Sequence, residues 1–301
     1  MSIDDTLSQL ERVCRYVASS IPLQRLVYVK MLASTARMAG FEETRAKLLP
    51  LLDTLAGDEK YVVRQHLSGQ LLDIALFLVH DFGDEGYALF LDRILPHFAC
   101  LVKDGKEEVR QAASEALVQS AHLVRADDLA AHILTVVLEL AHDDDNEDMR
   151  LTAALLLNDL APCFGSELCE QFVIPEVVSL GEDPAFRVRR QVALNMHHVC
   201  RVAHEQGASS SHRIEGTFAR LAEDDMYRVR RACTEMIPEM SRAVSAECRA
   251  HVFLDIFPQL MTDRNKTVRS GALHHLGSFI ATLESAQVRS LPAHVTPHCR
   301  S

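Results

Sequence analysis

The sequence has few of the features that mark secreted, membrane-bound or catalytic proteins. Its eight cysteines include no Cys-x-x-Cys pair, and most fall inside apolar helical stretches, as reduced packing residues do. The longest uninterrupted apolar run, 74–79, is far shorter than the ~20 residues that span a bilayer. No phosphate-binding glycine loop, nucleophile elbow or His-Glu-x-x-His motif is present. These absences argue against a disulfide scaffold, a membrane span and the common catalytic sites.

The amino-terminal residues and the net charge bear on the cellular location of the protein and on the class of its partners. Residues 1–5 carry no basic stretch and no apolar core, so the sequence predicts no signal peptide. We expect a soluble protein of the cytoplasm, with the nucleus as an alternative. The net charge of -11 repels nucleic acid phosphate, and the 31 basic residues are spread along the chain. The sequence therefore predicts neither a nucleic acid partner nor a membrane partner.

What the chain does contain is a repeat. Six times, an aspartate stands six residues before an arginine, and Val or Met directly precedes that arginine. The arginines lie 46, 40, 39, 41 and 39 residues apart. A period of about 40 residues with two apolar helical stretches in each copy is typical of a stacked helical-hairpin solenoid of the HEAT or armadillo kind. The pairs are Asp58 and Arg64, Asp104 and Arg110, Asp144 and Arg150, Asp183 and Arg189, Asp224 and Arg230, and Asp263 and Arg269.

The copies predict an all-α, right-handed solenoid of about seven antiparallel helix pairs, in a single domain of residues 1–286. Counting back 39 residues from Arg64 reaches Arg25, which marks a degenerate first repeat. No good helix is expected after Leu283, so residues 287–301 are predicted to form an irregular or truncated tail. The predicted repeats are 3–40, 41–82, 85–124, 127–164, 166–206, 208–244 and 246–286.

Within one repeat, the residue pattern predicts both helices and the turn between them. In 166–204, apolar residues recur every three or four positions through two stretches, which gives each helix one buried stripe. Pro175 falls inside the first helix and predicts a kink there, and Pro50 and Pro96 hold the same position in their repeats. The turn aspartates are suited to be N-caps of the second helices. The arginines are placed to reach the aspartate or the turn carbonyls of their own or the adjacent repeat.

We therefore interpret the six Asp and Arg pairs as a structural ladder. A residue that is needed once for chemistry would not recur in every repeat, so a catalytic role is not expected for them.

Recognition in a solenoid falls to the turns and to the concave face of the second helices, because the remaining faces are used for stacking. Phe186, Arg187, Tyr227 and Arg228 stand out, since aromatic and Arg side chains are enriched at interface hot spots. The alternative for these four is a semi-buried packing role in the hairpin. The predicted partner-binding residues are Lys60, Lys106, Glu107, Phe186, Arg187, Tyr227, Arg228 and Lys266.

Because the sequence contains 15 histidines, a metal enzyme is a further hypothesis for its function. Helical-repeat di-iron enzymes carry His-Glu dipeptides at repeat positions, whereas only His204-Glu205 occurs here. Neighbouring residues of a helix point about 100° apart, so His197-His198 and His274-His275 are expected to be packing or surface residues. The acidic run 143–148 lacks the glycine and the glutamate of a calcium loop. The sequence predicts no metal, no cofactor and no enzymatic activity.

The repeats resemble those of the regulatory and scaffold subunits of type-2A serine/threonine phosphatases, which carry the same turn aspartate and Val-Arg pair. The resemblance points most to the regulatory subunits of protein phosphatase 4, and it lies in 161–165, 174–175, 186–190, 199–200, 227–235 and 276–280. It implies a non-catalytic protein that binds a phosphatase catalytic subunit and directs it to substrates. Phosphoprotein substrates or further subunits would be its other partners. Such regulatory subunits are longer than this chain.

A HEAT-repeat adaptor of another class is the alternative function, such as a transport-receptor-like or assembly scaffold that binds peptides along its concave face. Long runs of inward acidic residues would favour transport, because basic cargo signals need them. Such runs are not evident, although 143–148 and 223–225 keep this alternative open.

Overall fold

The structure of the protein, a computed structural model, describes residues 6–205 and 211–291. Every regular element in these residues is helical, so the predicted all-α fold is confirmed. The chain forms two compact units, an N-terminal unit of residues 1–136 and a C-terminal unit of residues 137–301. Within the described ranges, no helix combines the length and the apolar character needed to cross a bilayer. The single-domain prediction for 1–286 stays a prediction.

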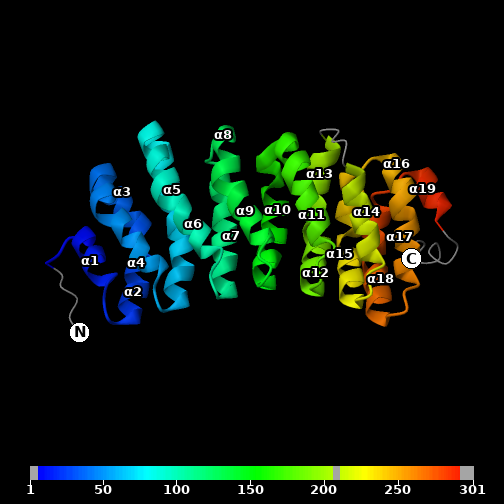
Figure 1. Ribbon diagram of the computed structural model, residues 1–301, viewed down its shortest axis with the longest axis horizontal. Helices are drawn as coiled ribbons and strands as arrows, with labels where there is room; N and C mark the ends of the chain where they lie inside the picture. Colours follow the sequence, from blue (N-terminus) through cyan, green and yellow to red (C-terminus); the bar gives the residue numbers. More distant parts are fainter. Residues whose placement is uncertain (1–5, 206–210, 292–301) are drawn as a thin grey trace. The chain divides into compact units, whose positions relative to one another are not determined.

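The N-terminal unit consists of helices that run up and down in order along the chain (Figure 1). Its α-helices are α1 Gln9–Tyr16, α2 Pro22–Val29, α3 Leu32–Glu43, α4 Leu52–Ala56, α5 Tyr61–Leu89, α6 Leu95–Leu101, α7 Glu107–Ala121 and α8 Ala126–Leu129. Helix α5 packs against α2, α3 and α7, so the second helices of successive repeats contact one another.

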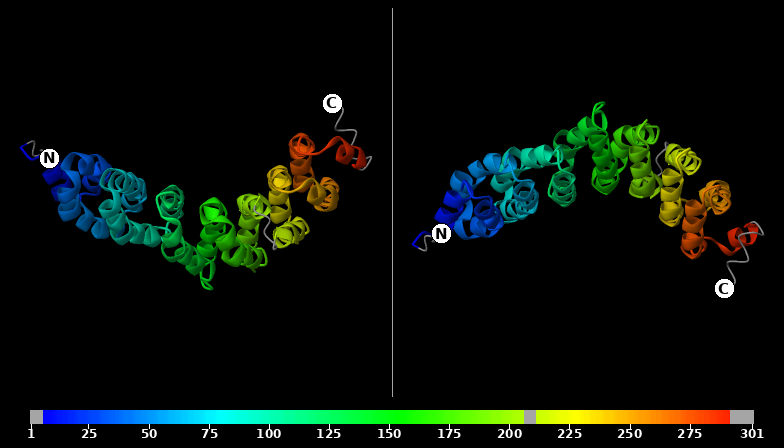
Figure 2. Two further views of the ribbon diagram at one scale, coloured as in Figure 1. Left: turned by 90° about the horizontal axis from the view of Figure 1, so that it is seen from above. Right: turned by 90° about the horizontal axis from the view of Figure 1, so that it is seen from below.

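The C-terminal unit continues the same alternation after α9 (Thr135–Ala141), which crosses the boundary between the units. Its helices are α10 Glu147–Leu168, α11 Ile174–Leu180, α12 Phe186–Asn195, α13 His197–Glu205, α14 Ser211–Ala222, α15 Tyr227–Ala243, α16 Ala246–Cys248, α17 Leu254–Met261, α18 Lys266–Ile280 and α19 Ser285–Ser290. First helices α11, α14 and α17 pack in turn, as do second helices α10, α12, α15 and α18, which gives two layers (Figure 2).

The core of each repeat comes from the apolar stripes. In the C-terminal unit, Val188, Val192 and Val199 are at most 2% exposed, and they face the layer of first helices. In the N-terminal unit, Leu67 and Leu71 are fully buried on α5 in the same way. Because each stripe lies between two helix layers, burial of these side chains is the main force that holds the hairpins together.

Three repeats are joined at glycines with positive φ. Gly40, Gly83 and Gly165 have φ of 81°, 54° and 72°, and each lies inside a stretch whose hydrogen bonding is otherwise helical. A side chain would strain this left-handed backbone, so glycine allows the chain to turn sharply from a second helix into the next first helix. The neighbouring Gly86 is held so close to the Leu78 carbonyl that a Cβ would lie 1.8 Å from its oxygen.

The predicted kink of the first helices takes the form of a π-helical turn. Pro50, Pro96 and Pro175 are each the second residue after such a turn. A wider turn is one way to accommodate a residue that lacks an amide hydrogen. The turns are η1 Thr44–Leu48, η3 Phe90–Ile94 and η5 Cys169–Val173, and two equivalent turns without a proline are η4 Ala130–Leu134 and η6 Arg249–Phe253. The π-helical turn therefore recurs in five of the repeats with or without a proline, and proline is one residue that suits the position after it.

The predicted irregular tail is wrong for its first residues. Residues 285–290 form α19, which begins with a capping box between Glu284 and Gln287. The Gln287 side chain also donates to the Ala246 carbonyl, so α19 is tied to the start of the preceding first helix. The expectation missed this helix because it is short and a proline follows it. Leu291 is the C-cap of α19, and the rest of the predicted tail, 292–301, lies outside the described residues.

Candidate partner-binding site

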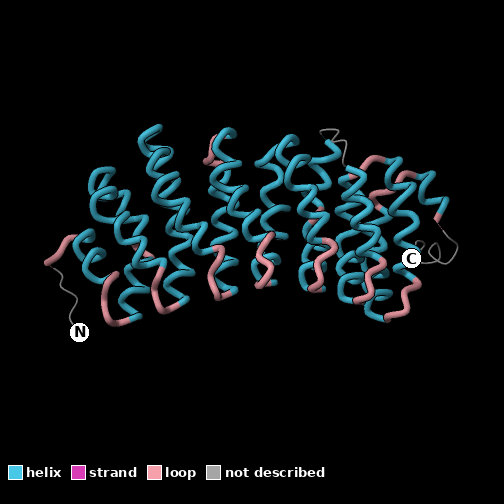
Figure 3. The backbone as a smooth tube through the Cα atoms, viewed as in Figure 1, coloured by secondary structure: helices cyan, strands magenta, loops and turns pink. Residues whose placement is uncertain are grey.

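Within each unit, the turns that join the first and second helices of a hairpin lie along one edge (Figure 3), and the predicted ladder residues lie there. Arg230 shows the arrangement. Its Nε lies 2.6 Å from Oδ2 of Asp263 and its Nη2 lies 3.0 Å from Oδ1, so the guanidinium donates two parallel bonds to the aspartate of the next repeat. Its Nη1 donates to the carbonyl of Asp224 in its own turn, at 2.6 Å. One side chain therefore fixes two successive turns to each other.

The same geometry recurs in both units. The further pairs are Arg25 with Asp58 and Arg64 with Asp104 in the N-terminal unit, and Arg150 with Asp183 and Arg189 with Asp224 in the C-terminal unit. Charge-assisted bidentate pairs of this kind are among the strongest hydrogen bonds in proteins. Ser19 stands six residues before Arg25, where the other repeats have an aspartate, and only the 39-residue phase of the sequence pointed to Arg25.

The turn aspartates differ from the predicted N-caps. Helix α7 has Lys106 as its N-cap, and Asp104 lies two residues earlier, where its Oδ1 accepts the Lys106 amide at 2.8 Å. Asp58, Asp183, Asp224 and Asp263 accept the amide two residues ahead in the same way. The aspartates thus close the turn before the helix, and the same carboxylate accepts the arginine of the preceding repeat through both of its oxygens.

The contacts lower the pKa of several ladder aspartates. Burial alone would raise the pKa of Asp58, but hydrogen bonds from Arg25 and from the Lys60 amide outweigh it, and the pKa lies below its ordinary value. The same balance lowers the pKa of Asp104 and of Asp263. These carboxylates are therefore held ionised by the arginines that they bind.

One predicted ladder residue is replaced by its neighbour. In the turn before α10, Asp143 accepts the Asp145 amide with its Oδ1 at 3.2 Å, and its carbonyl accepts Arg150 Nη1 at 2.7 Å. Asp144 is exposed, and its carbonyl accepts the same Nη1 at the longer distance of 3.3 Å. This turn contains one more residue between the aspartate and the helix, so counting six residues back from Arg150 selected Asp144.

The last ladder arginine of each unit, Arg110 or Arg269, differs from the other in how far its side chain is exposed. Arg110 is 6% exposed and donates to the Asp104 carbonyl of its own turn at 2.8 Å. Arg269 is exposed, and its Nη1 donates to the carbonyls of Asp263 and Arg264. Among the residues that the structure describes, Arg269 therefore has the contacts to its own turn without the buried carboxylate pair that Arg230 has.

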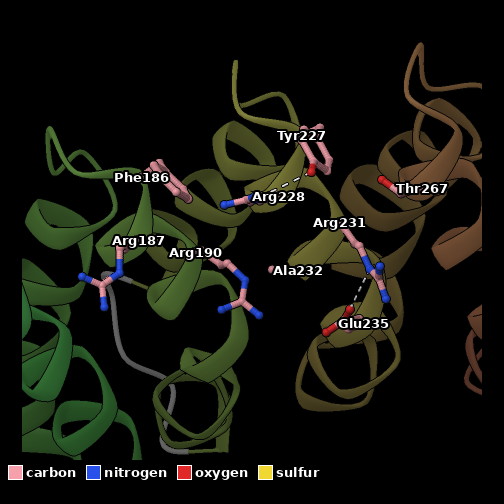
Figure 4. A pocket seen from close by; sticks show the side chains of 9 residues that line it. All are labelled: Phe186, Arg187, Arg190, Tyr227, Arg228, Arg231, Ala232, Glu235 and Thr267. Atoms are coloured by element: carbon pink, nitrogen blue, oxygen red, sulfur yellow. Dashed lines mark hydrogen bonds and ion pairs between the residues drawn. The ribbon is translucent and has the colours of Figure 1, made fainter. Parts of the chain in front are cut away.

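A basic groove of about 590 Å³ lies beside the ladder in the C-terminal unit (Figure 4). It runs between the starts of α12 and α15 and reaches α18. Four arginines and one glutamate line it, although the protein as a whole has a net charge of -11. Its lining residues are Phe186, Arg187, Arg190, Tyr227, Arg228, Arg231, Ala232, Glu235 and Thr267.

Aromatic rings and ion pairs position the arginines of the basic groove. The Arg228 guanidinium carbon lies 5.8 Å from the centre of the Phe186 ring and 5.9 Å from that of Tyr227, so Arg228 lies between two aromatic faces. Arg187 pairs with Glu147 and Asp148 on α10, and Arg231 pairs with Glu235 on its own helix at 3.1 Å. The groove therefore presents several exposed guanidinium groups beside apolar surface, which suits an acidic or phosphorylated partner segment.

A second hollow of about 570 Å³ extends the basic groove along α15 and α18. It shares Arg231, Glu235 and Thr267 with the first, and its further residues include Lys266, His274 and His275. The two hollows together make one basic surface across three successive second helices.

The structure brings some of the predicted partner-binding residues together. Phe186, Arg187, Tyr227 and Arg228 line the basic groove, and Lys266 lines its extension. The other three residues lie elsewhere, in the turns of the N-terminal unit. Lys60 and Lys106 are exposed N-caps of α5 and α7, and Glu107 is the first residue of α7.

Sequence reasoning missed Arg190 and Arg231, which also line the basic groove. Each follows a ladder arginine directly, at the same position of successive repeats. That doubled arginine was the signal available in the sequence.

Two histidine pairs depart from the expected geometry. The rings of His197 and His198 lie 4.1 Å apart between centroids, and those of His274 and His275 lie 4.9 Å apart, so neighbouring rings contact each other. His197 and His198 are the first two residues of α13, directly after Met196, which ends α12 with ψ of 0°. Burial, followed by the neighbouring His198, lowers the pKa of His197 to about 4, so its imidazole is neutral near pH 7.

Curated relatives are similar to the chain along nearly all of its length. Serine/threonine-protein phosphatase 4 regulatory subunit 1 of Rattus norvegicus and of Homo sapiens are each 28% identical to it over 286 residues, which is 94% of this chain. The same residues cover 30% of each relative, so the chain spans less than a third of their length. No protein-family model matches the chain.

Solved structures show the same architecture at low sequence identity. A chain from the structure of Kap95p with RanGDP has a TM-score of 0.71 and 12% identity, over 95% of this chain and 37% of that one. A mutant of Kap121p has a TM-score of 0.61 and 14% identity, over 99% of this chain and 32% of that one. At such identities the likeness shows the fold alone. The protein is an all-α solenoid of HEAT and armadillo type, similar in sequence to protein phosphatase 4 regulatory subunit 1.

Proposed function

We propose that this protein is a non-catalytic regulatory or scaffold subunit that binds a serine/threonine phosphatase catalytic subunit of the type-2A family, of the protein phosphatase 4 kind. The observation that carries the proposal is the 28% identity to protein phosphatase 4 regulatory subunit 1, which extends over 94% of the chain. The similarity includes several repeats and their turns, so it exceeds what a single shared motif would supply. Directing the catalytic subunit to phosphoprotein substrates, or to further subunits, is the second part of the proposal.

The basic groove is the part of the C-terminal unit that we assign to partner contact. Its arginines are exposed, it has aromatic side chains beside them, and it is not needed for the ladder. Aromatic and Arg side chains supply much of the binding energy in protein interfaces. An acidic surface of a partner would gain charge complementarity here, and its association rate would fall as salt concentration rises.

A transport-type adaptor is not favoured by this surface. The likeness to Kap95p and Kap121p shows the fold, and a groove lined by four arginines would repel a basic cargo segment. The cytoplasm, with the nucleus as an alternative, stays the prediction for its location.

The proposal is tested by reconstitution with a purified protein phosphatase 4-type catalytic subunit. The tagged chain should retain the catalytic subunit at a near-equal ratio after a moderate salt wash. The groove variant combines Arg190→Glu, Arg228→Glu and Arg231→Glu. Its matched control is Arg242→Glu, which reverses an exposed arginine of α15 that pairs only with Glu239 in the described residues and lies outside the groove.

Retention by the wild type and by the control, with loss in the groove variant, supports both the function and the place of contact. Retention by all three proteins would keep the function and reject the groove as the contact. No retention by the wild type, with other assemblies captured from a cell extract instead, would contradict the phosphatase function and favour the adaptor.

A further inference from the structure

A cluster of three unlike donor side chains lies in the C-terminal unit, outside the basic groove. His204 is near the end of α13, Glu215 is on α14 and Cys248 is the last residue of α16. One ligand atom from each residue lies within 4.8 Å of the other two. Because the three residues come from three helices, the fold brings them together, and no local spacing in the sequence marks the cluster.

The cluster is largely shielded from solvent. The His204 side chain is 17% exposed and the Glu215 side chain is 14% exposed. Nε2 of His204 lies 2.6 Å from Oε1 of Glu215, although the ring is not aligned for an ideal hydrogen bond, and no other partner reaches this buried atom in the described residues. A metal ion in the cluster would replace the proton that this short contact requires and accept the imidazole lone pair.

A second His–Glu pair in the same unit lacks these features. His142 lies 3.2 Å from Glu176, and its side chain is 66% exposed, with no cysteine in the pair. This pair has the character of an ordinary surface ion pair. His142 and Glu176 thus form the kind of ion pair that is common on helical surfaces, whereas His204 and Glu215 lie beside a third donor, Cys248.

The donor set fits one class of ligand. Imidazole nitrogen, carboxylate oxygen and thiolate sulfur are the three donors that zinc uses in proteins, and three protein donors leave a fourth position for water. Without a metal, burial and then the hydrogen bond to Glu215 raise the pKa of the Cys248 thiol to about 12, so the thiol is protonated. Zinc binding would release that proton and form the Zn–S bond in its place.

We propose that His204, Glu215 and Cys248 bind a zinc ion. The ion ties the end of α13 to α14 and to the end of α16, and it therefore links three helices of the C-terminal unit. The partner of His204 is Glu215 and not its sequence neighbour Glu205, which is exposed. This is why the His204-Glu205 dipeptide alone gave no reason to expect a metal. The proposal does not depend on the phosphatase function.

The test uses the full chain, purified without a metal-binding tag or chelator, then stripped and titrated with zinc alone and with cobalt alone. The wild type should bind one ion per chain, show a thiolate-to-cobalt charge-transfer band, and melt at a higher temperature with zinc. Cys248→Ser should lose the band, and Cys248→Ser and Glu215→Gln should each weaken zinc binding by at least about tenfold. His142→Gln is the matched control and should bind zinc like the wild type.

Circular dichroism of each metal-free variant checks that it is folded. Zinc binding by folded Cys248→Ser and Glu215→Gln at the wild-type level would overturn the proposal. So would a wild type that binds no zinc and melts at the same temperature with and without it.

Discussion

Arg230 and Arg231 are neighbours in the sequence, but they lie in two different regions of the C-terminal unit. The Arg230 side chain is 6% exposed and is bonded to Asp263 and to the Asp224 carbonyl, whereas the Arg231 side chain is 52% exposed and lines the basic groove. One repeat earlier, Arg189 and Arg190 divide in the same way. Consecutive residues of a helix face different directions, so one arginine enters the stack of turns and the next faces solvent.

The difference teaches that position in the repeat, more than residue type, determines the role of an arginine here. The ladder position is occupied in every repeat because each junction between hairpins needs it. The groove position carries arginine at 190 and 231 and serine at 270, so it varies between repeats. A recognition surface on a repeat scaffold needs exposed positions that can vary while the buried positions stay constant. The groove position and the ladder position have these two properties.

The largest effect is expected from Arg230→Ala. The substitution leaves the Asp263 carboxylate, whose side chain is 9% exposed, without its guanidinium partner. Breaking a buried ion pair from one side costs about 3 kcal/mol or more in the free energy of unfolding. Chemical denaturation followed by circular dichroism measures the change, and Arg231→Ala is the matched control with an expected loss below about 0.5 kcal/mol. Equal stability of the two variants would contradict the structural ladder.

Acid should weaken the ladder while leaving its residues in place. The pKa values of Asp58, Asp104 and Asp263 are lowered in the folded protein, so their contribution to stability is complete above the unfolded value of about 3.9 and is lost as pH falls through the folded values. Stability should therefore change little from pH 7 to about 5 on their account and decrease below about pH 4. Protonated carboxyls still accept hydrogen bonds, so this loss per pair should be smaller than that of Arg230→Ala.

The pH effect is assigned by substitution. Asp58→Asn should make the acid side of the stability curve shallower, whereas Asp144→Asn, at an exposed carboxylate, should leave it as in the wild type. An unchanged curve for Asp58→Asn would show that the ladder aspartates do not control acid stability.

Substitutions in the groove should weaken partner binding and leave stability nearly unchanged, whereas substitutions in the ladder should lower stability. Combining Arg190→Glu with Arg231→Glu should leave the free energy of unfolding within about 1 kcal/mol of the wild type, because both side chains are exposed. Binding of an acidic partner should weaken by about tenfold or more, since rim charge reversals replace attraction by repulsion. Titration of the purified partner at two salt concentrations measures this change. A large stability loss without a binding change would assign these arginines to the scaffold.

Of the two ladder arginines Arg230 and Arg269, the smaller loss of stability is expected from Arg269→Ala. Arg269 is exposed and contacts only the carbonyls of its own turn among the interactions described, at Asp263 and Arg264. Its removal should cost less than about 1 kcal/mol. A loss as large as that of Arg230→Ala would mean that the own-turn bonds, and not the bond to the next aspartate, provide the stability of the ladder.

The repeat period made much of the architecture predictable. It gave the two-helix repeat, the buried stripe that contains Val188 and Val192, and the first-repeat role of Arg25. It did not give the bonding of each aspartate, because the choice between an N-cap and a closed turn depends on where the previous arginine lies in space. It also selected Asp144 over Asp143, since one extra residue in a turn shifts the count without changing the period.

The candidate site was predictable only in part. Phe186 and Tyr227 were singled out because aromatic residues are enriched at interface hot spots, but the groove arginines Arg190 and Arg231 required knowledge of which side of the second helix is open. The cluster of His204, Glu215 and Cys248 could not be predicted from the sequence, because residues from three helices meet only after folding. Local periodicity predicts helices and their packing faces, whereas sites built between helices depend on the packing itself.

The central claim is that neighbouring arginines of one helix serve the scaffold and the interface separately. Arg230→Ala and Arg231→Glu, made singly, test it through two readouts on the same samples: the free energy of unfolding and retention of the phosphatase catalytic subunit. Arg230→Ala should lower stability by about 3 kcal/mol and, where it remains folded, keep binding, whereas Arg231→Glu should keep stability and weaken binding. The same pattern of loss in both variants would contradict the division between ladder and groove.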